Sequence, residues 1–216
     1  MTNPVISAVI CTYNRADRLI LALDGLKAQT LPREKYEVVV IDNASTDNTK
    51  AICTDYQQQL PHLVYHYEPD QGLSTARNTG LKVSTGMYIA YLDDDAIPCA
   101  NWLEDIVAAF ATVRPQPAVI GGPIYPIWEQ APPVWMHYYV QGYFPVLDHG
   151  NKADWFPDDE YPYGANMVYR RDVLLKHNGF SEDLGRDGKS LLSDEERLLN
   201  QTIKEDGGQF YYVPKD

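Results

Sequence analysis

Residues 88–98 read YIAYLDDDAIP, and this stretch decides the fold that we predict for the whole chain. An apolar run rich in aromatic and β-branched residues predicts a buried strand, and the aspartates and proline after it predict a polar loop. Asp93, Asp94 and Asp95 should therefore follow the carboxyl end of a core strand. Open α/β sheets place their ligands at such ends.

The three adjacent carboxylates favour a bound cation, because they repel one another and lose solvation near the edge of a sheet. A hard divalent ion such as Mn²⁺ or Mg²⁺ prefers oxygen ligands of this kind. The alternative is a solvated acidic turn that caps the next helix. Asn101 is better placed than the aspartates to cap the helix predicted for residues 102–113.

Apolar runs and helical patterns alternate along the first half of the chain. We predict strands at residues 5–10, 36–41, 62–68, 88–92 and 118–121, with helices between them, including one over 17–29 capped by Asp17. This βαβαβαβαβ order predicts a mostly parallel, doubly wound sheet flanked by helices. The length of 216 residues, 44% of them hydrophobic, suits a single globular domain.

Polar residues follow the earlier predicted strands as well. The first strand ends in a polar loop with one aromatic ring, and the second ends at Asp42, which has no obvious local duty. We therefore predict that Asp42 contacts a ligand. Arg77 would lie in a short helix that begins near Ser74, where an arginine suits an anion, although pairing with Asp70 explains it equally.

Charge and cysteine content restrict the class of protein. A net charge of -12 argues against a broad nucleic-acid interface, and the three cysteines show neither CxxC nor zinc-like spacing. A reducing, cytoplasmic setting is the simpler inference. We find no apolar run of membrane-spanning length and no signal peptide, which leaves peripheral association with the inner face of the membrane open.

The second half of the chain differs from the first in composition. Residues 122–163 mix proline with aromatic side chains, which suit either stacking on sugars or a cluster that covers the sheet: Trp128, Trp135, Tyr138, Tyr139, Tyr143, Phe144, Trp155 and Phe156. A later helix over residues 194–204 begins with Asp194, Glu195 and Glu196. These acids stabilise a helix start, and a general base is the alternative.

Taken together, these motifs resemble the inverting glycosyltransferases of family 2, which have the GT-A fold. The similarity runs from Val5 to the end of the chain and rests on six stretches in the family's order: VISAVICTYNR, VVVIDNASTD, GLSTARNTG, the aspartate triplet, GAN and DEERLLNQTIKEDGGQFYYVP. The family generally continues past this proline with another strand, so the chain is similar to a carboxyl-terminally shortened member.

The resemblance also implies roles for individual residues. Thr12, Tyr13, Arg15 and Asp42 match the pocket for the nucleotide base, whereas Gly72, Arg77 and Asn78 match the stretch that lines the ribose and diphosphate. Asp93 and Asp94 would meet ribose or water around the metal, and Asp95 would bind Mn²⁺ or Mg²⁺.

The catalytic base is implied by position. In the family a Glu-Asp pair precedes a helix, and its second member is the base. Counting back from Gly207 and Pro214 places that pair at Glu195 and Glu196, so this chain offers glutamate where aspartate is usual. Glu196 is the expected base, with Glu195 and Asp194 left open.

The resemblance implies metal-dependent, inverting transfer of a sugar from a nucleotide-diphosphate donor, a UDP-sugar above others, to a glycan or lipid-linked acceptor. Residues 1–121 would bind the donor, and residues 122–216 would bind the acceptor and supply the base. Two other functions remain open. A nucleotidyltransferase normally has a basic glycine-rich loop after the first strand, which CTYNRADR lacks. A sugar-nucleotide or glycan-binding module without catalysis is the other alternative.

Overall fold

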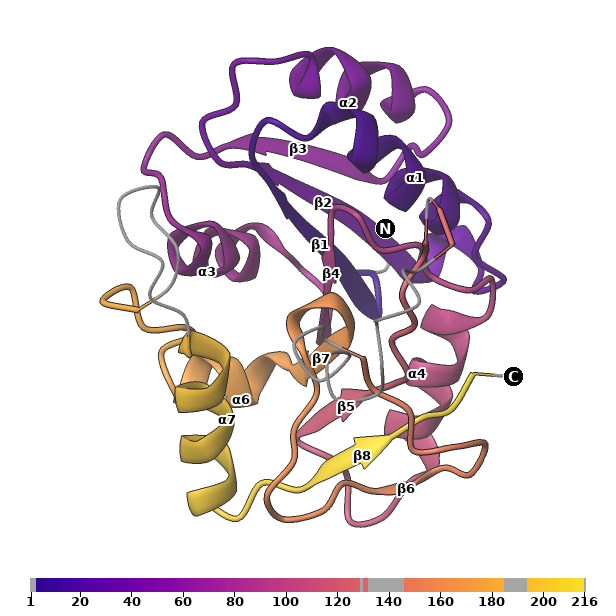
Figure 1. The fold of residues 1–216 in the computed structure, drawn as a ribbon, viewed down its shortest axis with the longest axis vertical. Helices are drawn as coiled ribbons and strands as arrows, with labels where there is room; N and C mark the ends of the chain where they lie inside the picture. Colours follow the sequence, from indigo (N-terminus) through magenta and orange to yellow (C-terminus); the bar gives the residue numbers. More distant parts are fainter. Residues whose placement is uncertain (1–2, 129, 132–145, 185–193, 216) are drawn as a thin grey trace.

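A computed structural model describes residues 3–128, 130–131, 146–184 and 194–215 of the chain (Figure 1). The strands are β1 (Ile6–Thr12), β2 (Tyr36–Asp42), β3 (Leu63–Tyr67), β4 (Tyr88–Asp93), β5 (Val119–Gly121), β6 (Asp154–Trp155), β7 (Met167–Arg170) and β8 (Phe210–Tyr212). The α-helices are α1 (Ala16–Lys27), α2 (Thr49–Gln57), α3 (Leu73–Val83), α4 (Trp102–Thr112), α6 (Arg171–Lys176) and α7 (Glu195–Glu205). Two short 3₁₀ helices, Arg33–Lys35 and Gly164–Asn166, precede β2 and β7.

The strands form one sheet in the order β3-β2-β1-β4-β7-β5-β8-β6. Strands β1 to β4 pair in parallel, and β5 pairs in parallel with β8. Strand β7 lies antiparallel between β4 and β5, and β6 is antiparallel to β8. The predicted mostly parallel sheet flanked by helices is confirmed, whereas the antiparallel β7, which joins the two parts of the sheet, was not predicted.

Both faces of the sheet are covered, as the unbroken apolar strands predict. On one face, side chains such as Ile10 pack with Leu23 of α1 and Phe110 of α4. On the other, Val9 and its neighbours pack with Ala76 of α3 and Leu199 of α7. Each large side chain buried in this way contributes about 1.5–3 kcal/mol before the cost of ordering the chain is subtracted.

Several element boundaries differ from the prediction by one or two residues, and two of these differences concern polar residues near the ends of β1 and β2. Strand β1 continues through Thr12, because its backbone pairs with β2 as far as Asp42. Helix α1 begins at Ala16, so Asp17 lies inside its first turn and is not its cap. The amide of Ala16 instead donates to Asp47 Oδ2 at 3.0 Å, so the loop after β2 supplies the capping carboxylate.

Among the described residues, no helix combines the length and the apolar character needed to cross a membrane.

Candidate active site

The carboxyl ends of three neighbouring strands meet at one edge of the sheet. Their registers place Thr12 of β1 opposite Asp42 of β2, and Cys11 of β1 opposite Asp93 of β4. Because parallel strands all end on the same side, the polar residues that follow them gather in one crevice. This edge is the candidate site.

The aspartate triplet lies at this edge and is bridged by an arginine. Asp94 is buried, with Oδ2 accepting from the Thr12 hydroxyl at 2.7 Å and Oδ1 accepting from Arg15 Nη1 at 2.9 Å. Arg15 Nη2 donates to Asp95 Oδ2 at 2.8 Å. The predicted need for a compensating cation is thus met in part by the chain itself.

The three carboxyl groups differ in environment. Burial raises the pKa of Asp93 from 3.8 to about 6, and the nearby positive charge of Arg77 opposes that shift. Burial also raises the pKa of Asp94, against the hydrogen bond from Thr12 and the charge of Arg15. The Asp95 side chain is 45% exposed, so it is the triplet carboxylate most accessible from solvent.

Asp42 is buried and has two local hydrogen bonds, so the premise that it lacks a local duty is wrong. Its Oδ1 accepts from the Ser45 amide at 2.9 Å, and its Oδ2 accepts from the Tyr65 hydroxyl at 2.7 Å. These bonds fix the carboxylate at the strand end, and each oxygen keeps further acceptor capacity for a ligand. Tyr65 was not singled out from the sequence, because cross-strand contacts have no local signal.

Two asparagines that the sequence analysis did not single out join the loops around the crevice. Asn14, at φ 52°, accepts from the Thr46 amide at 2.7 Å and so ties the loop after β1 to the loop after β2. Asn43 accepts from the Gly72 amide at 2.8 Å and donates to the Asp70 carbonyl at 2.8 Å. Asparagine tolerates the left-handed backbone, which is a local signal for Asn14 but not for Asn43.

The outer part of the same crevice holds the remaining residues matched to the nucleotide pocket. Tyr13 is exposed at the end of β1, and the Arg15 side chain is 49% exposed. Gly72 lies at the start of α3, held through its amide by Asn43. Tyr13 and Arg15 thus follow the buried Thr12 closely along the chain, and Gly72 is joined through Asn43 to the end of β2.

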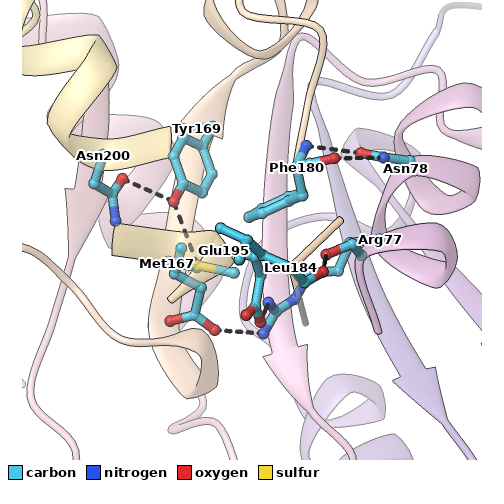
Figure 2. Close-up of polar contacts among 10 residues, drawn as sticks. Arg77, Asn78, Met167, Tyr169, Phe180, Leu184, Glu195 and Asn200 are labelled. Atoms are coloured by element: carbon cyan, nitrogen blue, oxygen red, sulfur yellow. Dashed lines mark hydrogen bonds and ion pairs between the residues drawn. The ribbon is translucent and has the colours of Figure 1, made fainter. Parts of the chain in front are cut away.

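Arg77 lies on the opposite wall and bridges two acids of α7 (Figure 2). Its Nη1 donates to Glu195 Oε1 at 2.8 Å, and its Nη2 donates to Glu196 Oε1 at 2.5 Å. The suggested pairing with Asp70 is therefore wrong, since the Arg77 side chain is only 4% exposed and turns towards α7. Burial opposes its charge, but the carboxylates, Glu196 first and Asp93 next, raise the pKa of Arg77.

Asn78, the next residue of α3, also holds a distant segment rather than facing the crevice. Its amide donates to the Phe180 carbonyl and accepts from the Phe180 amide, both at 2.8 Å, as Figure 2 shows. Gly179, at φ 72°, leaves room for it, because a Cβ there would lie 2.3 Å from Asn78 Oδ1. Ser74 adds a third link, donating to the Leu184 carbonyl at 2.8 Å.

The three acids at the start of α7 occupy different positions. Asp194 is exposed and has a left-handed backbone at φ 96°. The Glu195 side chain is 5% exposed, with one oxygen buried and without a hydrogen-bond partner among the described residues. The Glu196 side chain is 21% exposed and lies against Gly164, where a Cβ would come within 2.4 Å of its Oε1. Of the three, Glu196 combines a position fixed by Arg77 with partial exposure to solvent.

A cavity of about 720 Å³ opens beside the triplet. One side carries Arg15, Asp93 and Asp95, and the other carries Tyr125, Trp128 and further apolar side chains from the segment after β5. Asn166 supports its floor by accepting from the Trp102 indole at 2.9 Å. The cavity can therefore accommodate a molecule with both polar and apolar parts.

The aromatic residues of the segment 122–163 separate into two groups. Trp128 and Tyr125 line the cavity, as a role in ligand stacking requires. Trp155 and Phe156 pack against Tyr211 and Tyr212 of β8, so they cover the sheet. Trp135, Tyr138, Tyr139, Tyr143 and Phe144 lie outside the described residues.

The donor atoms of the triplet suit a hard divalent ion, although they do not enclose one. Within the described part of the chain, no three His, Cys, Asp or Glu residues form a cluster that could hold a metal by themselves. Mg²⁺ is commonly held by one or two carboxylates together with substrate phosphates and water. Asp95, exposed at the rim of the cavity, fits such a shared site.

Comparisons with known proteins agree with this arrangement. The model of the family "Glycosyl transferase family 2" matches residues 7–177. Glycosyltransferase AglE of Haloferax volcanii is 40% identical over 104 residues, 48% of this chain and 34% of that protein. The glucosyl-dolichyl phosphate glucuronosyltransferase of the same organism is 24% identical over 209 residues, 94% of this chain and 64% of that protein.

A solved structure covers the whole chain. Mannosyltransferase PcManGT from Pyrobaculum calidifontis, in complex with GDP-Man and Mn²⁺, matches 100% of this chain with a TM-score of 0.73 and 25% identity. This likeness confirms the predicted GT-A fold. The chain spans 56% of that protein, and 34% and 64% of the two relatives above, so it corresponds to about one to two thirds of their lengths.

Proposed function

We propose that this chain, which belongs to glycosyl transferase family 2, carries the site of a metal-dependent, inverting glycosyltransferase. The observation that carries the proposal is the convergence at one sheet edge of the Asp93–Asp95 triplet with Glu196, which faces it from α7. The likeness to a mannosyltransferase that binds GDP-Man and Mn²⁺ supports a nucleotide-sugar donor.

The donor would lie over the ends of β1, β2 and β4. Asp42, whose carboxylate is held by the Ser45 amide, and the exposed ring of Tyr13 would meet the nucleotide base, together with Thr12 and Arg15. Gly72 would lie next to the ribose, and Asp93 and Asp94 would approach the ribose from the other side. We expect a uridine base, and guanosine is the alternative that the neighbouring structure raises.

Asp95 would hold Mn²⁺ or Mg²⁺ together with the diphosphate. A bound divalent ion stabilises the negative charge that builds up on the departing diphosphate. For the ion to bind, Arg15 must release or share Asp95, which its 49% exposure permits. Arg15 can then face the diphosphate itself.

Glu196 would act as the general base. Its carboxylate accepts the proton of the acceptor hydroxyl while the oxygen attacks the anomeric carbon from the face opposite the diphosphate, typically a contribution of about 10² to 10⁴ in rate. A single displacement without a covalent intermediate inverts the configuration at that carbon. Glu195, held deeper by Arg77, supports this base.

The acceptor would enter through the 720 Å³ cavity. Its apolar wall, with Tyr125 and Trp128, suits the faces of a sugar or the first part of a lipid carrier.

In this proposal residues 1–121 bind the donor, and residues 122–216 bind the acceptor and supply the base. A lipid-linked acceptor would bring the protein to the inner face of the membrane, and the three free cysteines suit the cytoplasm.

Calorimetric titration with UDP and GDP, with and without Mn²⁺, tests donor binding, and a transfer assay on the wild type and Glu196→Gln tests catalysis. We expect Mn²⁺-dependent binding, and turnover that falls at least about a hundredfold in Glu196→Gln with binding retained. Binding without any turnover would support a silent binding module. Release of pyrophosphate from a nucleoside triphosphate would support a nucleotidyltransferase.

A further inference from the structure

We propose that Arg77 is a positioning residue for Glu196 and not a contact for the donor diphosphate, and that Glu195 is the counter-ion that holds Arg77 in place. This inference rests on the proposed function, because it concerns how the proposed base is held. It departs from the role that the family resemblance implies for Arg77.

The hydrogen bonds of the guanidinium set the relative positions of the two carboxylates. Nη1 donates to Glu195 and Nη2 donates to Glu196, at 2.8 and 2.5 Å. A guanidinium is planar, and its donors diverge at fixed angles, so bonds to two acids define where each carboxylate lies. A lysine ammonium has no such fork and cannot impose the same geometry.

Arg77 is itself fixed at both ends. Its backbone carbonyl accepts from the Tyr91 hydroxyl at 3.0 Å, and its Cζ lies 5.2 Å from the centre of the Phe180 ring. The Phe180 backbone is in turn bound by Asn78 (Figure 2). Arg77 is therefore anchored through its backbone on the core strand β4 and through its guanidinium on the segment that follows α6.

A diphosphate contact would need N–H groups that face the crevice. The Arg77 side chain is only 4% exposed, whereas the Arg15 side chain is 49% exposed. Arg15 therefore offers the accessible guanidinium for a phosphate. Arg77 directs two of its donors to α7 instead.

The backbone at Gly164 packs against both Glu196 and Arg77. A Cβ at residue 164 would lie 2.4 Å from Glu196 Oε1 and 2.7 Å from Arg77 Nη2. The backbone of the short helix before β7 thus packs directly on the pair and leaves Glu196 little freedom to move. Close packing of this kind holds a reacting group in its productive geometry.

The deciding experiment combines Arg77→Lys with Glu196→Gln in a double-mutant cycle, with kcat and the donor Kd measured for each protein. We expect Arg77→Lys to lower kcat about a hundredfold while the Kd for UDP or GDP with Mn²⁺ stays within about twofold. In the Glu196→Gln background, Arg77→Lys should lower kcat little further, because Arg77 affects transfer only through Glu196.

Additive losses of kcat, or a Kd weakened tenfold or more by Arg77→Lys, would overturn the inference. Arg171→Lys is the matched control, since Arg171 bonds the Ser84 carbonyl at the other end of α3, and it should change neither quantity. If Arg77→Lys does not fold, Glu195→Gln replaces it, with a lowered kcat and an unchanged Kd expected. If the wild type transfers no sugar, the proposed function fails, and the titration alone decides whether Arg77 contacts the donor.

Discussion

Two arginines each bridge a pair of acids in this protein, and they differ chiefly in exposure. Arg15 joins Asp94 and Asp95 at the rim of the cavity with 49% of its side chain exposed, whereas Arg77 joins Glu195 and Glu196 with only 4% exposed. The exposed bridge can open at little cost, because water replaces its contacts. The buried bridge cannot, because an unpaired charge would remain in the interior.

This difference in exposure suggests that Arg15 and Arg77 have different roles in the proposed reaction. In the proposed mechanism, Arg15 would exchange one of its carboxylate partners for a diphosphate when a donor and a metal ion bind. Arg77 would keep both of its partners, so that Glu196, the proposed base, stays in one position. The following predictions test whether the contrast is real.

The largest effect is expected from Asp95→Ala, which removes the exposed carboxylate of the first bridge. Transfer should fall to background, because the ion that stabilises the departing diphosphate loses its protein ligand. The assay is sugar transfer at several Mn²⁺ concentrations, with the thermal midpoint as a check on folding. Activity close to wild type would mean that the metal is held elsewhere.

Next in size is the effect of each arginine on stability, measured by urea unfolding. Arg77→Met should lower the free energy of unfolding by about 3–5 kcal/mol, because it leaves two carboxylates without their buried partner. Arg15→Met should lower it by about 0–1 kcal/mol, as for an exposed ion pair. Equal losses of unfolding free energy in Arg77→Met and Arg15→Met would mean that the buried and the exposed ion pairs do not differ in strength.

A smaller effect is expected from Gly164→Ala, which pushes a methyl group towards Glu196 and Arg77. We expect kcat to fall about tenfold through displacement of the base, with donor affinity unchanged. The control is Gly150→Asn, since position 150 has a left-handed backbone that asparagine tolerates and no neighbours within 4 Å. A weakened donor Kd in Gly164→Ala would place the donor nearer to α7 than we propose.

The smallest effect concerns Asp93, which lies between the two bridges. Its pKa is raised from 3.8 to about 6, so the folded protein binds a proton that the unfolded chain releases between these values. Stability should therefore fall as pH rises from about 4 to 6 and stay lower above that range. Without metal, Asp93→Asn should be more stable than wild type at pH 7.5 and lose this advantage near pH 4. Unfolding curves that keep the same difference at both pH values would contradict the raised pKa.

Much of the fold was predictable because its signals are local. The apolar runs of β1, β2 and β4 and the helical spacing of α1 and α4 identified most of the first half of the sheet. Strands β6, β7 and β8 were not predicted, because they are two to four residues long and gain their pairing from distant partners. Of the short strands, only β5 was predicted, because residues 118–121 include an apolar run that the other three lack in recognisable form.

The candidate residues divide in the same way. The sequence by itself determined that Asp93, Asp94 and Asp95 end a core strand and that acids begin α7, because strand ends and helix starts follow from neighbouring residues. Only the tertiary structure decided that Asp42 is held by Tyr65, that Arg15 bridges the triplet and that Arg77 reaches α7. Side chains more than a hundred residues apart, as Arg77 and Glu195 are, meet through the packing of whole elements, and no local pattern records which donor reaches which acceptor.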